Sequence, residues 1–120
     1  VTVLAVGTNS AATTAMLRAG ADKAATGENA VAVACRRADV IVGPVGIVIA
    51  DAMLGEITPA MALAVGQSAA ARVLVPVNQC DNIVAGAQGL PMARLVQSAA
   101  EAVESLAAGG PGAGAQSGAH

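Results

Sequence analysis

The chain has 120 residues, of which 55% are hydrophobic and 12% are charged, and its formal net charge is −2. It has no basic stripe and no Phe, Tyr or Trp, so it lacks the phosphate contacts and stacking platforms of nucleic-acid-binding proteins. The longest apolar run, residues 40–50, is broken by Gly and Pro and is too short to span a bilayer. We therefore expect a single domain with neither a nucleic acid nor a membrane as a partner.

The core predicted from this composition is thin. The sequence contains 31 Ala residues, so each buried side chain removes little surface from water. A second copy of the chain would add buried surface, and we expect a homo-oligomer with a two-fold dimer as the default. The sequence shows no export signal, which favours the cytoplasm, and its two Cys residues predict free thiols.

The first predicted elements are a strand over residues 1–6 and a helix over residues 11–19. Asn9 or Ser10 can cap this helix, because short polar side chains accept hydrogen bonds from the first free amides. Gly20 then predicts the end of the helix.

The middle of the chain predicts a brief edge strand over residues 21–25 and a helix over residues 26–37. Residues 40–42 are Val-Ile-Val, an unbroken β-branched run that is typical of a central parallel strand buried on both faces. The next four residues, Gly-Pro-Val-Gly, predict a type I turn with Pro44 at its second position. A helical turn is expected over residues 50–55.

A helix is predicted over residues 60–71, with Thr58 as its cap and Pro59 at its first position. Strands are expected over residues 73–77, a buried apolar run, and over residues 83–85, at an edge of the sheet.

The most regular helix is predicted from Pro91 to Leu106, because its apolar residues recur at helical spacing and its charged residues lie on the opposite face. Residues 109–120 contain mainly Gly, Ala, Ser and Pro and are expected to be a disordered tail. The sequence thus predicts one domain over residues 1–108.

Strands that alternate with helices at this spacing predict an α/β fold of three layers, a mostly parallel sheet with helices on both faces. Ligands of such Rossmann-like folds bind outside the carboxyl ends of the strands. We therefore expect the ligand-binding residues in four loops at one edge of the sheet: Gly7, Thr8, Asn9, Ser10, Thr26, Gly27, Glu28, Asn29, Gly43, Pro44, Gly46, Asn78, Gln79 and Cys80.

Five motifs together resemble a small family of bacterial proteins known only as a conserved domain of unknown function. They are Gly-Thr-Asn-Ser at 7–10, Ala-Thr-Gly-Glu-Asn at 25–29, Ile-Val-Gly-Pro-Val-Gly-Ile-Val at 41–48, Leu-Gly-Glu-Ile-Thr-Pro-Ala-Met-Ala at 54–62 and Val-Pro-Val-Asn-Gln-Cys at 75–80. The resemblance covers about residues 1–106 and implies a Rossmann-like fold but no particular reaction. Members of that family begin with a further strand and a Gly-rich turn, so we expect an N-terminal truncation here.

Residues 7–10 combine a tight turn, hydroxyls and free amides at a helix N-terminus, which are the features of an anion site. An ordinary capped helix explains the same residues. Glu28 suits the first turn of a helix, and it also suits a ribose or amine acceptor or a general base. Glu56 suits the region before a helix start, and it equally suits the same edge as Glu28. Gly43, Pro44 and Gly46 suit a turn as well as close approach of a ligand to the backbone.

Catalytic chemistry has few candidates in this sequence. Cys80 is expected in a polar loop, where a thiol can react, whereas Cys35 is expected on an apolar helix face. The single histidine, His120, is in the expected tail, so neither a Cys–His pair nor a Ser–His–Asp triad is predicted. We expect no metal, because the histidine and cysteine count excludes structural zinc and no motif supports magnesium.

Three functions remain open from the sequence. The first is a domain that binds a nucleotide or another small anionic metabolite at the sheet edge. The second is a small enzyme that uses Glu28 or Cys80 with polar loop residues. The third is a structural or regulatory subunit of an oligomer, in which the same loops only pack.

Overall fold

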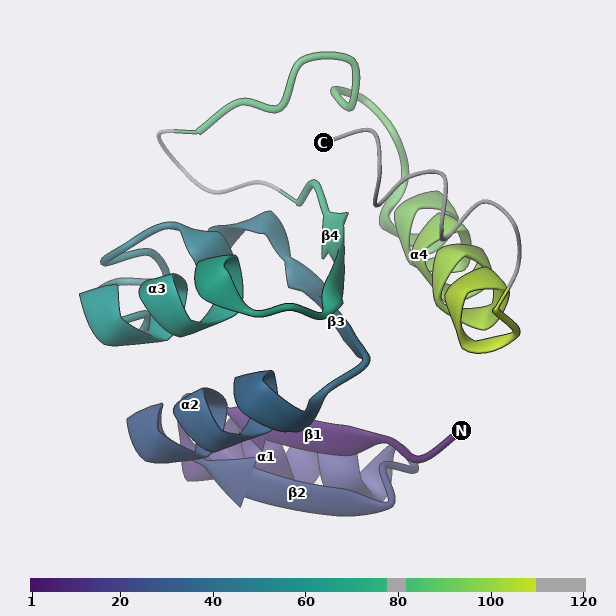
Figure 1. Ribbon diagram of the computed structural model, residues 1–120. Helices are drawn as coiled ribbons and strands as arrows, with labels where there is room; N and C mark the ends of the chain where they lie inside the picture. Colours follow the sequence, from purple (N-terminus) through teal and green to yellow (C-terminus); the bar gives the residue numbers. More distant parts are fainter. Residues whose placement is uncertain (78–81, 110–120) are drawn as a thin grey trace.

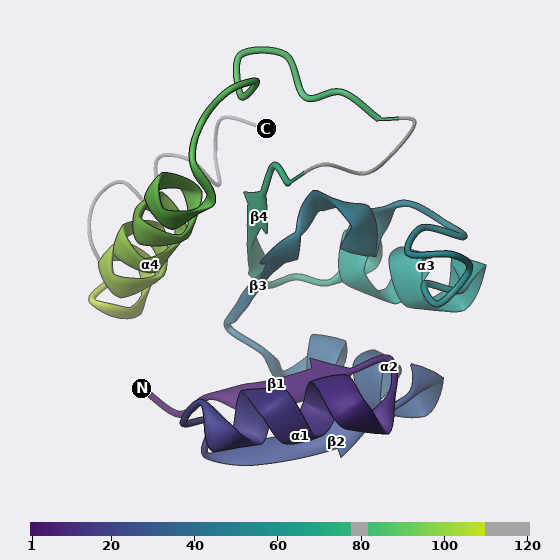
Figure 2. The ribbon, with the colours of Figure 1, turned by 180° about the vertical axis from the view of Figure 1, so that it is seen from behind.

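The computed structural model describes residues 1–77 and 82–109. Figures 1 and 2 show a mixed α/β arrangement from opposite sides. Its elements in chain order are β1 (Leu4–Gly7), α1 (Ser10–Arg18), β2 (Lys23–Thr26), α2 (Glu28–Arg37), β3 (Val40–Pro44), a 3-10 helix η1 (Val45–Val48), α3 (Pro59–Gln67), β4 (Ala71–Val75) and α4 (Met92–Ala107).

The strands pair in parallel but form two small sheets. β1 pairs with β2, from Leu4 opposite Lys23 to Gly7 opposite Thr26. β3 pairs with β4, from Val40 opposite Ala71 to Pro44 opposite Val75. The α/β class and the parallel pairing agree with the prediction. The predicted single sheet is not seen among the described strands, because β1 and β3 do not pair, so the Rossmann-like three-layer arrangement is not confirmed.

Helices pack against both strand pairs and against one another. α1 contacts β1 and β2, α2 packs closely on α3, and α4 contacts β4 and β3. Both views place α3 and α4 on opposite sides of the β3–β4 pair (Figures 1 and 2). The α2–α3 contact joins the two sheets, because α2 also packs on β1 and α3 also packs on η1.

The buried core lies mainly around the α2–α3 contact. Cys35 of α2 and Met61 and Val65 of α3 are buried there, together with Ile57 just before α3. The hydroxyl of Ser68 donates to the backbone carbonyl of Cys35 at 2.6 Å and so fixes the end of α3 against α2. No residue of α4 is buried, so this amphipathic helix covers its sheet only in part.

The predicted helix starts are confirmed by the capping contacts. The Asn9 side chain accepts a hydrogen bond from the Ala12 amide at 2.8 Å at the start of α1. The Thr58 hydroxyl accepts one from the Met61 amide at 3.1 Å, and Pro59 opens α3, where its missing N–H costs nothing. α4 begins just after Pro91, as its periodicity predicted.

Two predicted turns are wrong. Pro44 has φ −63° and ψ 153°, an extended conformation that a type I turn excludes, because Pro44 still pairs with Val75 in β3. The chain turns one residue later, through η1. The predicted helical turn over residues 50–55 is also wrong, because Asp51, Met53 and Leu54 have left-handed φ values of 66°, 59° and 57°.

Two further predictions, the end of α3 and a strand over residues 83–85, differ from the structure. α3 ends at Gln67 rather than at residue 71, because Ser68 is extended and residue 71 already belongs to β4. The strand expected over residues 83–85 does not form; the chain there leads into turns at Gly86 and Gly89, both with positive φ. The expected tail beyond residue 109 lies outside the described residues.

Candidate ligand-binding edge

Five polar side chains gather where β1 and β2 end and α3 begins. We call this set the polar edge: Thr8, Asn9, Glu28, Glu56 and Thr58. They come from three segments that are distant in sequence, so the fold rather than a local motif brings them together.

Glu56 ties the segment before α3 to the loop after β1. Its carboxylate accepts hydrogen bonds from the Thr8 hydroxyl and from the side-chain amide of Asn9, the latter at 3.0 Å. These hydrogen bonds from Thr8 and Asn9 stabilise the charged form and lower the pKa of the Glu56 carboxyl below its ordinary value. The Glu56 carboxylate therefore already occupies the Thr8 hydroxyl, one of the donors that the sequence offered for an anion, and the side-chain amide of Asn9.

Glu28 makes the second tie, between α2 and α3. The Thr58 hydroxyl donates to the Glu28 carboxylate at 2.5 Å while it accepts from the Met61 amide. Glu28 is also in the first turn of α2, where the helix dipole favours a negative charge. One hydroxyl thus links the N-termini of two helices.

The loops after β1 and β2 are joined directly. The Gly27 amide donates to the Gly7 carbonyl at 3.0 Å, and the hydroxyls of Thr13 and Thr26 are 2.7 Å apart. Gly7 is tightly enclosed, because a Cβ atom there would be 2.8 Å from the Thr13 backbone nitrogen and 2.9 Å from the Asn9 carbonyl oxygen. Only glycine fits at this position.

The structure brings together part of the predicted site. Hydrogen bonds connect Gly7, Thr8, Asn9, Gly27 and Glu28 to one another or to the segment before α3, whereas Thr26 is hydrogen-bonded to Thr13 of α1. Ser10 is the first residue of α1, and Asn29 is exposed in the first turn of α2. The predictions for Asn78, Gln79 and Cys80 lie outside the described residues.

In the predicted loop after β3, the three candidate residues shape the backbone and the packing of η1. Gly43 belongs to β3, and a Cβ atom there would be 3.0 Å from the Ile47 side chain, so this glycine lets η1 fold back. Pro44 is extended at the strand end, and Gly46 is buried in η1. No described hydrogen bond connects these three residues to the polar edge.

Sequence reasoning left Glu56 and Thr58 out of the predicted ligand-binding set. Thr58 was assigned only as a cap, and Glu56 lies two residues before that cap. The available signal was a carboxylate beside a helix start, in the segment Gly-Glu-Ile-Thr-Pro. The direction of the Glu56 side chain depends on the left-handed turn before it, which includes Gly55 at φ 89°.

Metal and thiol chemistry find little support in the described residues. No group of three His, Cys, Asp or Glu side chains there could hold a metal ion. Cys35 is buried, and this burial raises the pKa of its thiol, so the reactive thiolate is disfavoured. No helix in residues 1–77 and 82–109 is long and apolar enough to cross a membrane.

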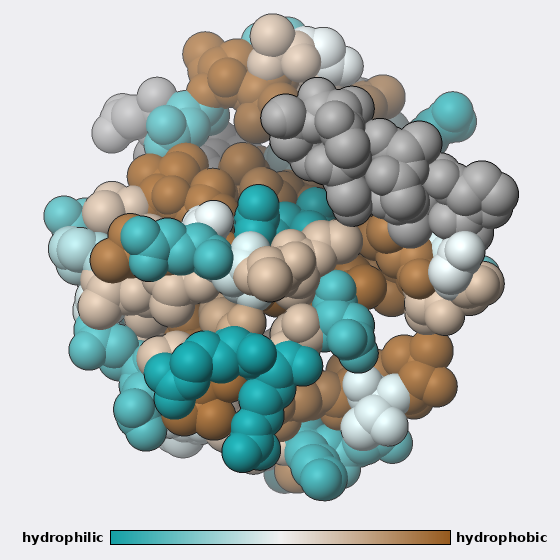
Figure 3. Space-filling view, viewed as in Figure 1, coloured by the Kyte–Doolittle hydropathy of each residue, from teal (hydrophilic) through white to brown (hydrophobic). Residues whose placement is uncertain are grey.

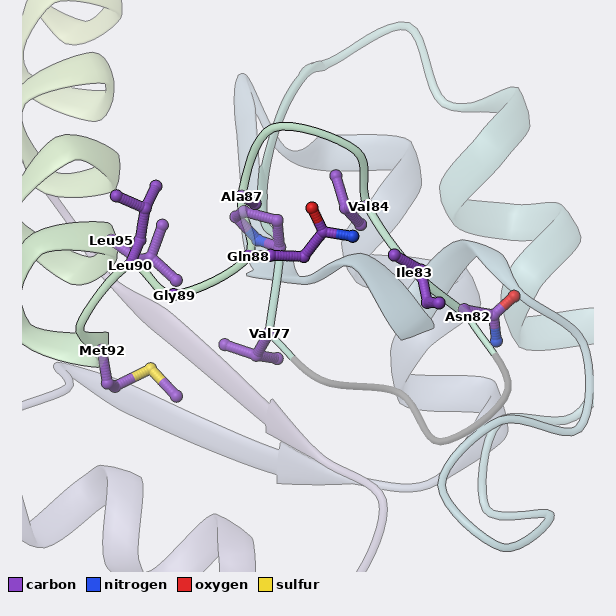
Figure 4. A pocket seen from close by; sticks show the side chains of 11 residues that line it. Val77, Asn82, Ile83, Val84, Ala87, Gln88, Gly89, Leu90, Met92 and Leu95 are labelled. Carbon is purple, nitrogen blue, oxygen red and sulfur yellow. The ribbon is translucent and has the colours of Figure 1, made fainter.

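A second feature lies beyond the end of β4. A hollow of about 450 Å³ opens between residues 76–77, the loop 82–90 and the first turn of α4 (Figure 4). We call it the apolar hollow; the side chains that give it this character are Val77, Ile83, Val84, Leu90, Met92 and Leu95. Two uncharged amide side chains, Asn82 and Gln88, also line it.

The parallel strand pairs, the helices packed on them and the polar groups at the strand ends define a small mixed α/β domain. A family model, "Domain of unknown function (DUF3842)", matches residues 1–108. The chain therefore belongs to this family of unknown function, as its motifs indicated. No curated protein and no solved structure matches it.

Proposed function

We propose that this chain is a Rossmann-like domain that binds a nucleotide, or a similar small anion bearing hydroxyl groups, at the polar edge. The observation that supports this most is the contact of two carboxylates with threonine hydroxyls, Glu56 with Thr8 and Glu28 with Thr58. A ribose offers hydroxyl donors of the same kind. A ligand hydroxyl could replace a threonine hydroxyl without leaving the carboxylate unpaired.

Charge decides which ligand class suits this edge. The N-terminus of α1 favours an anion, through free amides and the helix dipole. Glu28 and Glu56 oppose one, since like charges that lie close together repel each other. A bare phosphate would be attracted by the N-terminus of α1 and repelled by the two carboxylates. A nucleotide brings hydroxyls for the carboxylates as well as a phosphate for the amides.

One observation favours the structural-subunit alternative. All five polar-edge residues donate to or accept from another member of the set, so they already satisfy one another, and Asn9 also caps α1. Ties of this kind hold elements together without any ligand. The two readings differ in one measurable respect: only the first predicts that a ligand stabilises the fold.

The test is the thermal midpoint of unfolding, followed by far-ultraviolet circular dichroism, with AMP, adenosine, inorganic phosphate and succinate. We expect the midpoint to rise with AMP concentration, since binding to the folded state adds about 2.7 kcal/mol at a hundredfold excess over Kd. Phosphate and succinate should shift it less. The chain has no Trp or Tyr, so a co-purifying nucleotide would dominate its near-ultraviolet absorbance.

Matched variants separate binding from folding. Glu28→Gln and Asn9→Ala should reduce the AMP shift by more than they lower the unliganded midpoint, because a lost cap costs only about 1 kcal/mol. Glu101→Gln, which removes an exposed carboxylate on α4, should leave the AMP shift unchanged. A midpoint that none of the four compounds moves would favour the structural subunit.

A further inference from the structure

We infer that the turn over residues 51–56 is a latch, which the Glu56 side chain holds closed against the loop after β1 and which opens without unfolding the rest of the chain. The opening itself does not depend on a ligand. What it would release rests on the proposed function, because Glu56 occupies the Thr8 hydroxyl and the side-chain amide of Asn9.

The backbone of this turn is strained. Asp51, Met53 and Leu54 have φ values of 66°, 59° and 57°, in the left-handed region that residues other than glycine disfavour. Gly55 has φ 89°, which glycine adopts without this cost. Strained residues keep such conformations only where other contacts hold them, and they are frequent in segments that switch between two states. The contacts of the turn therefore decide whether it opens.

Burial does not hold the tip of the turn. Leu54 is 102% exposed and Met53 42%. The turn lies beside the start of α3 (Figures 1 and 2), and Figure 3 shows hydrophilic and hydrophobic residues intermixed at the left of the face drawn, over α3 and the segment before it. The tip therefore gains almost nothing from burial that would offset its strained backbone.

The Glu56 carboxylate ties the turn to a distant segment. In the part of the chain that the structure describes, the two hydrogen bonds that it accepts are the only ones from residues 51–56 to another region. The other hydrogen bonds of these residues stay within residues 49–57. Glu56 is exposed, so water competes for its carboxylate oxygens. One exposed side chain thus closes a strained turn.

The base of the turn is firm. Ile57 is 4% exposed, its amide donates to the Ala52 carbonyl at 3.1 Å, and its carbonyl accepts from the Asp51 amide at 2.7 Å. Thr58 follows it and caps α3. Exposed segments with few packed contacts open at a lower free energy than the core does. Opening therefore moves residues 53–56 on a fixed base, while α3 stays folded.

Hydrogen exchange of single amides, measured by NMR on the full chain without ligand, tests the inference. The reporters are the amides of Gly55 and Glu56, which donate to carbonyls inside the turn at 3.1 and 3.2 Å. Thr8→Val removes the hydroxyl donor and keeps the size of the side chain. It should lower the protection factors of both reporters roughly fivefold, the change expected for one lost hydrogen bond. The amide of Val65 in the buried part of α3 should keep its protection factor.

Two substitutions at Leu54 test the strain and leave the Glu56 hydrogen bonds in place. Leu54→Gly accepts the left-handed φ and should raise the protection factors of both reporters, whereas the β-branched Leu54→Val should lower them. Neither variant loses packing, because the Leu54 side chain is fully exposed. Glu101→Gln, at an exposed carboxylate on α4, is the matched control and should leave both reporters unchanged.

Equal protection factors of the reporters in Thr8→Val and the wild type would overturn the inference, since Glu56 would then not hold the turn. So would an equal fall at Val65, because the turn would then open only when the chain unfolds. Reporters that respond to neither Leu54 variant would likewise overturn it, since strain would not favour opening. The measurement uses no ligand, so its result is separate from that of the AMP test.

Discussion

The polar edge and the apolar hollow both lie beyond the carboxyl ends of strands, yet they are built in opposite ways. At the polar edge, Glu28 and Glu56 bind hydroxyls and an amide from other segments, so polar groups cross-link β1, α2 and α3. At the hollow, Ile83, Leu90 and Met92 remain open to water. Polar contacts between distant segments therefore hold the first region, whereas apolar side chains stay exposed at the second.

This difference follows from packing as well as from polarity. The polar edge adjoins the buried α2–α3 core, in which Met61 and Val65 are almost fully covered. The hollow adjoins α4, which has no buried residue. We therefore expect the free energy of unfolding to depend strongly on the first region and only weakly on the second.

The largest effect expected is that of Met61→Ala, with Met92→Ala as its counterpart in the open region. Met61 is 5% exposed and Met92 56%, so the same truncation removes buried contacts only at Met61. Met61→Ala should lower the free energy of unfolding by about 2–3 kcal/mol, the lower part of the range for core truncations. Met92→Ala should change it by less than about 0.5 kcal/mol. Urea denaturation at low micromolar chain concentration measures both.

Equal losses for the two methionine variants would contradict the contrast between the regions. They would mean that α4 is as firmly packed as α3 in the isolated chain.

The second prediction compares two glycines. In Gly7→Ala the new methyl would overlap the backbone of residues 9 and 13, so these loops must shift, and we expect a loss of about 1–3 kcal/mol. In Gly66→Ala, inside α3, the new methyl has no atom within 4 Å, and helix propensity predicts a gain of about 0.5–1 kcal/mol. Thermal and urea unfolding should show opposite signs. A neutral Gly7→Ala would show that the loop after β1 is not tightly enclosed.

Local sequence rules predicted much of this fold and little of the contact between distant segments. Asn9, Thr58 and Pro91 mark helix starts through short-range chemistry, and all three were predicted correctly. The turn at Pro44 was wrong because pairing with Val75 keeps it extended, a long-range contact. The splitting of the strands into two pairs is likewise a tertiary property, which strand propensity does not predict.

The candidate site shows the same limit. Gly7, Thr8 and Glu28 follow strands or open helices, so the general rule for parallel sheets placed them at one edge. Glu56 is attached to that edge by a turn with three left-handed residues other than glycine, which sequence rules disfavour. Local patterns allowed Glu56 to reach the same edge as Glu28 but did not decide it, so the residue that reverses the electrostatic expectation at residues 7–10 stayed outside the predicted site.

The smallest expected effect is a pH dependence that reports on Glu56 itself. Hydrogen bonds from Thr8 and Asn9 lower the pKa of its carboxyl in the folded chain, so folding favours the carboxylate. The stability that this contributes is present above the ordinary glutamate pKa of about 4.3 and is lost as the pH falls through the lower folded value. Glu56→Gln keeps an acceptor oxygen and does not titrate. The thermal midpoint of the wild type should exceed that of Glu56→Gln at pH 7, and the two should converge as the pH falls towards 3.

Glu101→Gln corrects for the loss of one charge on an exposed helix face. Glu56 is itself exposed, so the effect should shrink in high salt. A gap that persists unchanged from pH 7 to pH 3 would mean that Thr8 and Asn9 do not hold the charged form of Glu56. Their donors would then be free for an external anion.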